Sequence, residues 1–234
     1  MFDHFSLFDF VAWYLVFLFS TTAHEAAHAF AALKLGDDTA HRGGQVSLDP
    51  TPHITREPFG MVIVPIISYL MGGWMIGWAS APYDPEWARR FPKRSALMAM
   101  AGPLANLLLV LLAALLIHVG INLGFFEMPD SLRFMSMVSA KSDGIWNVAA
   151  VLLSLTFSLN FLLFIFNLLP VPPLDGSEIP LIFLPHTAAE KYSNFIHSPM
   201  LSFMGIFVAW QVFGSIFPPL QSVARHLLYP GHYL

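Results

Sequence analysis

The chain has 234 residues, of which 56% are hydrophobic and only 11% are charged, with a formal net charge of −4. A soluble domain carries about 25% charged residues, so this composition predicts an integral membrane protein. The lack of cysteine excludes disulfide scaffolds, thiolate metal sites and cysteine nucleophiles, and the lack of a basic tract excludes a nucleic-acid partner. No cleavable signal peptide is expected, because the first nine residues lack a basic segment.

The first predicted span covers about residues 8–35, which at ~1.5 Å per residue is long enough to cross a ~30 Å hydrocarbon core. Between residues 10 and 33 it is almost wholly apolar apart from His24, Glu25 and His28. Residues four apart lie on the same face of a helix, so the two histidines can bind one metal ion. Glu25 is turned by about 100° from His24, which suits a general base better than a ligand. Because burying these groups in lipid is costly, we expect the cluster to be functional.

The next two segments each leave an alternative open. Residues 43–48 alternate like a short strand, which predicts either a small hairpin or edge that could pair with a substrate backbone, or a plain loop. Residues 59–81 carry no charge but contain Pro65 and several glycines, which fits a full span or a re-entrant hairpin.

The later spans are predicted at about 95–119, 144–167 and 199–222, where the chain carries no Asp, Glu, Lys or Arg. The basic cluster at 89–94 marks a cytoplasmic loop by the positive-inside rule. With a re-entrant 59–81 segment, the ends of the first and the 144–167 spans converge near the cytoplasmic surface. A full crossing would separate them, which favours the re-entrant form.

A hydrolytic zinc site needs a third protein ligand and an open position for water. Asp175 is the best candidate, because three prolines just before it end a helix at membrane depth and stiffen the loop that carries it. Glu178 and Glu190 remain as alternatives. Asn160 lies on about the same helix face as Asn167, and we interpret it as a packing contact between helices.

The chain contains three stretches of interest, HEAAH at 24–28, AGPLAN at 101–106 and NLLPVPPLDG at 167–176. In these stretches the sequence resembles the site-2 protease family (M50) of intramembrane zinc metalloproteases. This resemblance implies an all-α polytopic membrane protein with a three-span metalloprotease core, a re-entrant or hairpin segment and one further C-terminal span. A single peptidase domain is expected over 1–234, with its core at about 8–180 and a linker and span at about 181–234, in the compact form without PDZ or CBS domains.

The resemblance also implies roles for single residues. His24, His28 and Asp175 are expected to bind one zinc ion, and Glu25 to activate the attacking water. Asn106 and Asn167 resemble the family's active-site asparagines, which would hold the substrate strand or stabilise the oxyanion. Two imidazoles and a carboxylate suit zinc well.

The expected function is hydrolysis of peptide bonds within or near the transmembrane helix of a membrane-protein substrate, in the cytoplasmic membrane of a prokaryote, with the site near the cytoplasmic face. The lipid bilayer is the expected surrounding, and the oligomeric state stays open. One alternative is a metal-ion transporter, although transport needs ligands spread over several spans. Another is a non-catalytic metal-binding scaffold, which would have no need of Glu25 because Glu25 is not expected to bind the metal. A third is a membrane-anchored protease for soluble peptides.

Overall fold

A computed structural model describes residues 6–230, which are mainly helical. Three helices are long and apolar enough to cross a membrane: α1 (Leu7–Leu35), α6 (Pro92–Asn122) and α7 (Ile145–Asn167). A fourth candidate is α9 (Pro199–Leu228), whose two parts, 199–209 and 211–228, meet at an angle of 43°. These helices confirm the expected all-α polytopic membrane fold.

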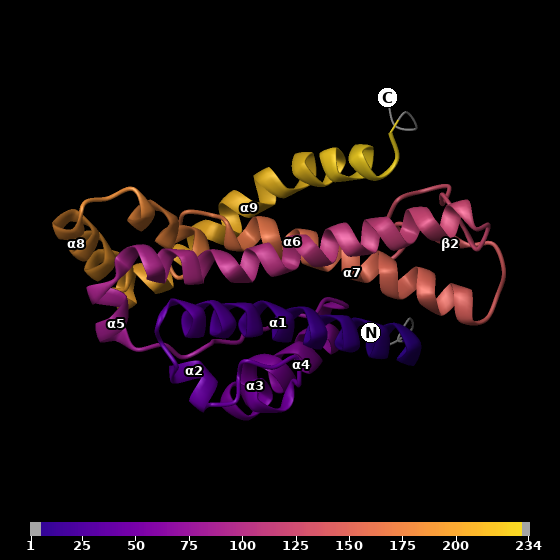
Figure 1. The fold of residues 1–234 in the computed structure, drawn as a ribbon. Coiled ribbons are helices and arrows are strands. Elements are labelled where there is room, and N and C mark those ends of the chain that lie inside the picture. The colour runs from indigo at the N-terminus through magenta and orange to yellow at the C-terminus, as the bar shows by residue number, and fades with distance from the viewer. Residues whose placement is uncertain (1–5, 231–234) are drawn as a thin grey trace.

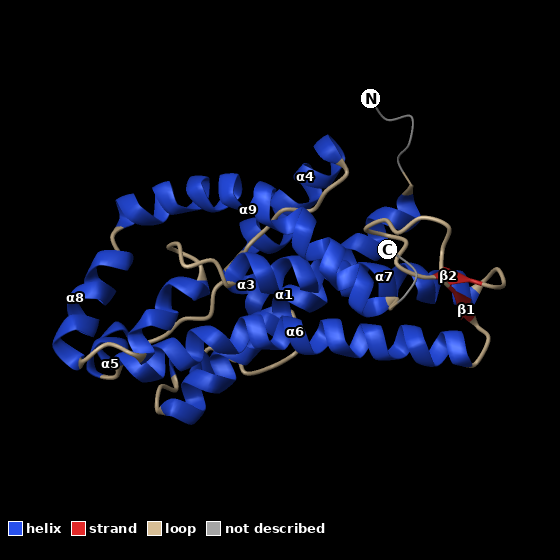
Figure 2. Ribbon diagram, turned by 90° about the horizontal axis from the view of Figure 1, so that it is seen from above, coloured by secondary structure: helices blue, strands red, loops and turns tan. Residues whose placement is uncertain are grey.

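The three long helices lie side by side along the long axis of the molecule, and α6 packs against both α1 and α7 (Figure 1). α6 runs antiparallel to both neighbours. The short strands lie at one end of the bundle, and α5 and α8 lie at the other (Figure 2). The C-terminal end of α1, the start of α6 and the end of α7 therefore meet at the same end of the bundle.

The remaining elements are short and fill the connections between the long helices. The two strands pair antiparallel, with Phe126 opposite Ala140. η1 is a single π-helical stretch and η2 is a 3-10 helix. The bounds are α2 (Thr39–Arg42), α3 (Thr51–Arg56), η1 (Phe59–Ile63), α4 (Val64–Gly72), α5 (Pro85–Arg90), β1 (Phe126–Glu127), β2 (Ser139–Ala140), η2 (Asp175–Ile182) and α8 (His186–Ile196).

Local chemistry fixes both ends of α1. The Ser6 hydroxyl accepts a hydrogen bond from the backbone N–H of Asp9 at 3.2 Å, which caps the first turn. Gly36 ends the helix in the left-handed conformation, with φ of +105°, and its N–H donates to the carbonyl of Leu33. These ends place His24 and His28 in the C-terminal half of α1.

The surface of α6 explains why the bundle belongs in lipid. Seven of its leucines are between 45% and 66% exposed: Leu97, Leu104, Leu108, Leu111, Leu112, Leu115 and Leu116. An apolar surface of this extent is costly in water and is favourable in a bilayer. The buried residues of α6 are instead mostly small, including Ala96, Ala99 and Gly102, which lets neighbouring helices approach closely.

Residues 59–81 fold as a hairpin. η1 and α4 have 5 and 9 residues, which at ~1.5 Å per residue reach ~21 Å together and fall short of a ~30 Å core. Gly73, with φ of +72°, turns the chain, and an extended segment returns so that the Trp78 N–H donates to the Gly60 carbonyl at 3.1 Å. A Cβ at Gly60 would overlap Trp78, so glycine is required for this close return. The geometry supports the re-entrant alternative over a full span.

The strand alternative for residues 43–48 is wrong. The segment follows α2 as a series of turns, and within residues 6–230 the strands are β1 and β2. The N–H of Gln45 donates to the carbonyl of Ala40 and closes the first turn, and Gly44 adopts a φ of +75°. Two adjacent glycines favour a turn over a strand, and this outweighs the short alternation of apolar residues.

Candidate metal centre

Three polar side chains of α1 gather in the interior at the expected place. His24, Glu25 and His28 are each less than 8% exposed, and one ligand atom from each lies within 4.8 Å of the others. The Nε2 atoms of His24 and His28 are 3.0 Å apart. One turn of helix therefore brings the two imidazoles together, as their spacing predicts.

Asp175, the first residue of η2, faces both imidazoles. Its Oδ2 lies 3.1 Å from Nε2 of His24, and its Oδ1 lies 3.4 Å from Nε2 of His28. The turn that presents it packs tightly on the end of α7, because a Cβ at Gly176 would overlap the carbonyls of Leu168 and Leu169. The sequence motif Asp-Gly is thus explained by close packing of the turn that follows the prolines.

The spacing of the two Nε2 atoms and the two carboxylate oxygens of Asp175 fits a zinc ion. Zinc in a tetrahedral site binds nitrogen and oxygen ligands at about 2.0–2.2 Å, which separates neighbouring ligand atoms by about 3.3 Å. The three separations here are 3.0, 3.1 and 3.4 Å. His24, His28 and Asp175 therefore form a triangle of the size that such an ion requires.

The protonation of the rings supports the same conclusion. Nδ1 of His28 lies 2.8 Å from the main-chain carbonyl of Met98, and Nδ1 of His24 lies 2.6 Å from Oδ1 of Asn106. Both partners are acceptors, so each Nδ1 carries a proton, and in the neutral ring each Nε2 then presents a lone pair. Two lone pairs and a carboxylate then point at one another, and Asp175 Oδ2 is buried without a hydrogen-bond donor. Such a group of acceptors calls for a cation.

Gly102 of α6 leaves the space beside these atoms open. A Cβ at this position would overlap the Nε2 atoms of both His24 and His28. The glycine belongs to the AGPLAN stretch, but sequence reasoning gave it no role. Its position next to both ligand nitrogens could have been found only from the packing of α6 on α1.

A chain of buried amides contacts His24 at its Nδ1 atom. Asn106 Nδ2 donates to Oδ1 of Asn160 at 2.8 Å, and Asn160 Nδ2 donates to Ser20 Oγ at 2.9 Å and to the Thr156 carbonyl at 2.8 Å. Asn106 thus contacts a candidate ligand, as an active-site residue should. Asn160 was interpreted from the sequence as a packing contact only, and its link to His24 was missed.

The two other residues with predicted catalytic roles have different surroundings. Glu25 forms no hydrogen bond or ion pair with the rest of residues 6–230, so its carboxylate is free for a water molecule. Asn167, the last residue of α7, donates from its amide to the carbonyl of Leu163 in its own helix at 3.1 Å. The structure brings Glu25 to the cluster, and the role of Asn167 stays a prediction.

The alternative third ligands lie elsewhere. Glu178 accepts a hydrogen bond from Ser95 at 3.1 Å and pairs with His197 at 3.0 Å, while Glu190 is exposed on α8. Hydrogen bonding to Glu178 raises the pKa of His197, and burial raises the pKa of Tyr83, whose hydroxyl lies 3.2 Å from His197. The polar contacts of Glu178 are thus with Ser95 and His197, and not with the two α1 histidines.

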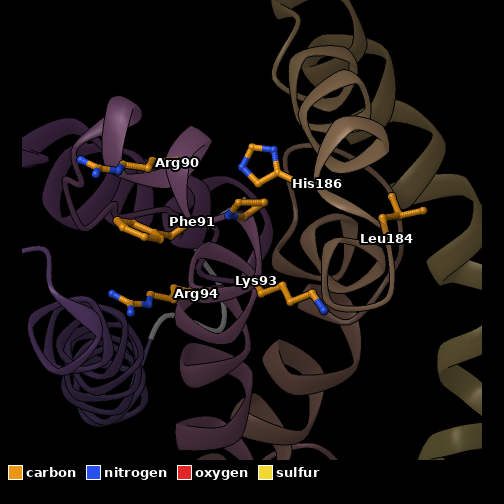
Figure 3. A pocket seen from close by; sticks show the side chains of 7 residues that line it. Arg90, Phe91, Lys93, Arg94, Leu184 and His186 are labelled. Carbon is orange, nitrogen blue, oxygen red and sulfur yellow. The ribbon is translucent and has the colours of Figure 1, made fainter.

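A pocket of about 250 Å³ opens at the start of α6, apart from the metal cluster. Arg90 and Arg94 extend to the left in Figure 3 and Lys93 to the right, so the three cationic heads do not converge on one point. Arg94 lies over the Phe91 ring at 4.4 Å and donates to the Leu35 carbonyl at 2.9 Å. These cations lie where α1 ends and α6 begins.

The fold and the site define a polytopic membrane protein with a buried His-Glu-His-Asp cluster of the metallopeptidase kind. A family model described as Peptidase family M50 matches residues 12–210, and the chain belongs to this family.

Two curated relatives agree with this membership. "Putative zinc metalloprotease YwhC" of Bacillus subtilis (strain 168) is 31% identical over 226 residues, which cover 88% of this chain and 92% of the relative. "Putative zinc metalloprotease Rip2" of Mycolicibacterium smegmatis (strain ATCC 700084 / mc(2)155) is 27% identical over 159 residues, or 68% of this chain and 52% of the relative. No solved structure gives a significant match.

Proposed function

We propose that this protein is an intramembrane zinc metalloprotease of the site-2 protease type, which hydrolyses peptide bonds within or near a transmembrane segment of its substrate. The observation that carries the proposal is the triangle of His24, His28 and Asp175 inside a bundle of apolar helices, with separations of 3.0–3.4 Å. Membership of the M50 peptidase family supports hydrolysis over transport or scaffolding.

One zinc ion is the proposed cofactor, held by His24, His28 and Asp175. It would polarise the scissile carbonyl and make a water molecule acidic enough to attack near neutral pH. Glu25 takes one proton from that water as the water oxygen bonds to the carbonyl carbon. It then gives the proton to the amine nitrogen as the carbon–nitrogen bond breaks. The free carboxylate of Glu25 supports this role, because no protein partner within residues 6–230 competes for it.

The two asparagines receive different roles. Both polar atoms of Asn106 are occupied, one by His24 and one by Asn160, so we assign Asn106 to holding His24 instead of contacting the oxyanion. Asn167 keeps the predicted oxyanion or substrate contact. A helical substrate must unwind before attack, because its peptide carbonyls are hydrogen-bonded within the helix.

The location follows from charge. Arg89, Arg90, Lys93 and Arg94 lie at the α5–α6 junction, and Met98, which contacts His28, lies one turn further along α6. By the positive-inside rule this end faces the cytoplasm. We therefore place the site near the cytoplasmic face of a prokaryotic cell membrane, with a membrane-protein substrate that reaches it from the bilayer.

The test compares the wild type with Glu25→Gln in liposomes, using a panel of single-span model substrates and measuring bound zinc in both proteins. Cleavage by the wild type that is lost in Glu25→Gln, with zinc still bound, is the expected result. Glu190→Gln is the matched control, because Glu190 is exposed on α8, and it should cleave like the wild type.

Two outcomes would contradict the proposal. Equal cleavage by the wild type and Glu25→Gln would remove Glu25 as the base. Absence of zinc from the purified wild type, even after zinc is supplied, would remove the metal site itself.

A further inference from the structure

The amide chain behind His24 is completely buried and links all three long helices. Asn106 of α6, Asn160 of α7 and Ser20 of α1 are each 0% exposed. Ser20 lies one turn before His24 on the same helix, so the chain of contacts begins and ends on α1. Buried networks of this kind are costly unless every member is paired, and every amide atom of the two asparagines has a partner.

One contact fixes the direction of the whole chain. The carbonyl of Thr156 can only accept a hydrogen bond, so the side chain of Asn160 must turn its NH₂ group toward Thr156. Oδ1 of Asn160 is then the atom that faces Asn106, and it too can only accept. Asn106 must therefore present its own NH₂ group to Asn160, which leaves its Oδ1 facing Nδ1 of His24.

The direction determines the tautomer of His24. An acceptor at Nδ1 requires the proton to sit there, and the lone pair is then at Nε2, next to Asp175 and His28. If Asn106 were free to flip, its NH₂ group could face Nδ1 instead. The proton would move to Nε2, and the nitrogen that faces the other ligands could no longer bind a metal.

We infer that Asn160 is a positioning residue, which acts through Asn106 to keep the metal-binding lone pair of His24 on Nε2. The inference rests on the proposed zinc site. The main-chain carbonyl of Thr156 can only accept a hydrogen bond, so it fixes the orientation of the Asn160 side chain on α7. Asn160 in turn fixes the orientation of the Asn106 side chain on α6. Asn160 therefore does more than join helices.

The first experiment measures zinc affinity of the full-length protein by competition with a chelator, and records the spectrum of the Co²⁺-substituted protein. Asn160→Leu keeps a side chain of similar size but removes the donor and the acceptor. Its zinc affinity is expected to fall about 10–100-fold, which is typical for loss of an outer partner of a metal-bound histidine. The Co²⁺ spectrum should also change. If Asn160→Leu does not fold, the smaller Asn160→Ala takes its place.

A matched control separates positioning from packing. Ser154 lies on α7, is 0% exposed, and accepts hydrogen bonds from the N–H groups of Met137 and Val138 in the α6–α7 loop. Ser154→Ala should lower the unfolding temperature while leaving zinc affinity and the Co²⁺ spectrum unchanged. A loss of zinc affinity in Ser154→Ala equal to that in Asn160→Leu would overturn the inference.

A double variant tests whether Asn160 acts by orienting the side chain of Asn106. Asn106→Asp supplies an acceptor to His24 whichever way the side chain is turned, so Asn160 is no longer needed to orient it. In that background Oδ1 of Asn160 faces a carboxylate oxygen, and Asn160→Leu should leave zinc affinity unchanged or raise it. A packing role instead predicts the same fall in both backgrounds, and that result would overturn the inference.

The outcomes distinguish this inference from the proposed function. If the wild type binds no zinc, both fail. If the wild type binds zinc and Asn160→Leu binds it equally well with an unchanged Co²⁺ spectrum, the inference fails while the proposed function stands.

Discussion

Glu178 Oε1 lies 3.0 Å from Nε2 of His197, and this ion pair joins η2 to the residue that follows α8. Ser95, in the first turn of α6, donates to the other oxygen of the same carboxylate. Glu178 lies three residues after Asp175, which is one turn of the 3-10 helix η2. The pair therefore holds the segment that presents a candidate metal ligand.

The pair predicts a dependence of stability on pH. Hydrogen bonding to Glu178 raises the pKa of His197 above its ordinary value of 6.5. The charged imidazole thus stabilises the folded state fully below about pH 6.5, and this stabilisation is lost as the pH rises through the raised pKa. Because the imidazole is partly exposed, the effect should be on the order of 1 kcal/mol or less. The unfolding temperature of the wild type should fall between pH 6 and pH 9 by more than that of His197→Asn. Parallel curves for the two proteins would contradict this role.

Asp175 and Glu178 should differ sharply as ligands. Asp175→Asn removes the charge that faces both imidazoles, and its zinc affinity should fall by more than the ~10–100-fold that outer partners contribute. Glu178→Gln should lower zinc affinity far less, because Glu178 contacts Ser95 and His197 and neither imidazole of the metal cluster. Zinc bound per protein, measured after dialysis against a weak chelator, checks both variants. Retention of zinc in Asp175→Asn with loss in Glu178→Gln would exchange the two assignments.

Gly102→Ala should abolish zinc binding. The added methyl group would overlap both Nε2 atoms, and the rings cannot move away from α6 without breaking the hydrogen bonds of their Nδ1 atoms to Asn106 and Met98 on the same helix. Gly214→Ala in α9 is the control, since a Cβ there meets no atom within 4 Å. It should stabilise the helix by about 0.5–1 kcal/mol and leave zinc binding intact. Normal zinc binding by Gly102→Ala would show that the two rings lie farther from α6 than this geometry places them.

The hairpin predicts which loops share a side of the membrane. The chain lacks cysteine, so single substitutions can be labelled without background. His41→Cys and Glu86→Cys, exposed before and after the hairpin, should react with an impermeant maleimide from the same side, and exposed Glu127→Cys from the opposite side. Labelling of His41→Cys and Glu86→Cys from opposite sides would mean that residues 59–81 cross the bilayer completely.

Much of the fold follows from the sequence, because long apolar runs and a few helix-ending residues define the spans. Gly36 and the prolines after Asn167 end α1 and α7 where their chemistry requires. The pairing of His24 and His28 can also be predicted from the sequence, since helical spacing alone brings the rings together. Asp175 could be proposed because a carboxylate beside a broken helix at membrane depth is costly unless a cation or a donor pairs with it.

The features that escaped prediction depend on contacts between helices. The amide of Asn160 could pair with any neighbour, and only the packing of α7 on α6 shows that the neighbour is Asn106. Gly102 reads as one small residue among many until α1 lies beside it. The strand proposed for 43–48 failed because adjacent glycines outweigh a brief alternation. The structure of so short a segment is determined by the backbone preferences of single residues, whereas a long helix can override those preferences.

The hydrogen-bond partners of His24 and His28 differ in whether a substitution can remove them. The partner of His24 is the side chain of Asn106, so a single codon change can remove it. The partner of His28 is the main-chain carbonyl of Met98, which every amino acid at that position supplies. Position 98 can therefore drift among residues that fit the helix while the hydrogen bond persists. The hydrogen bond that supports His28 therefore cannot be recognised from the identity of the residue at position 98.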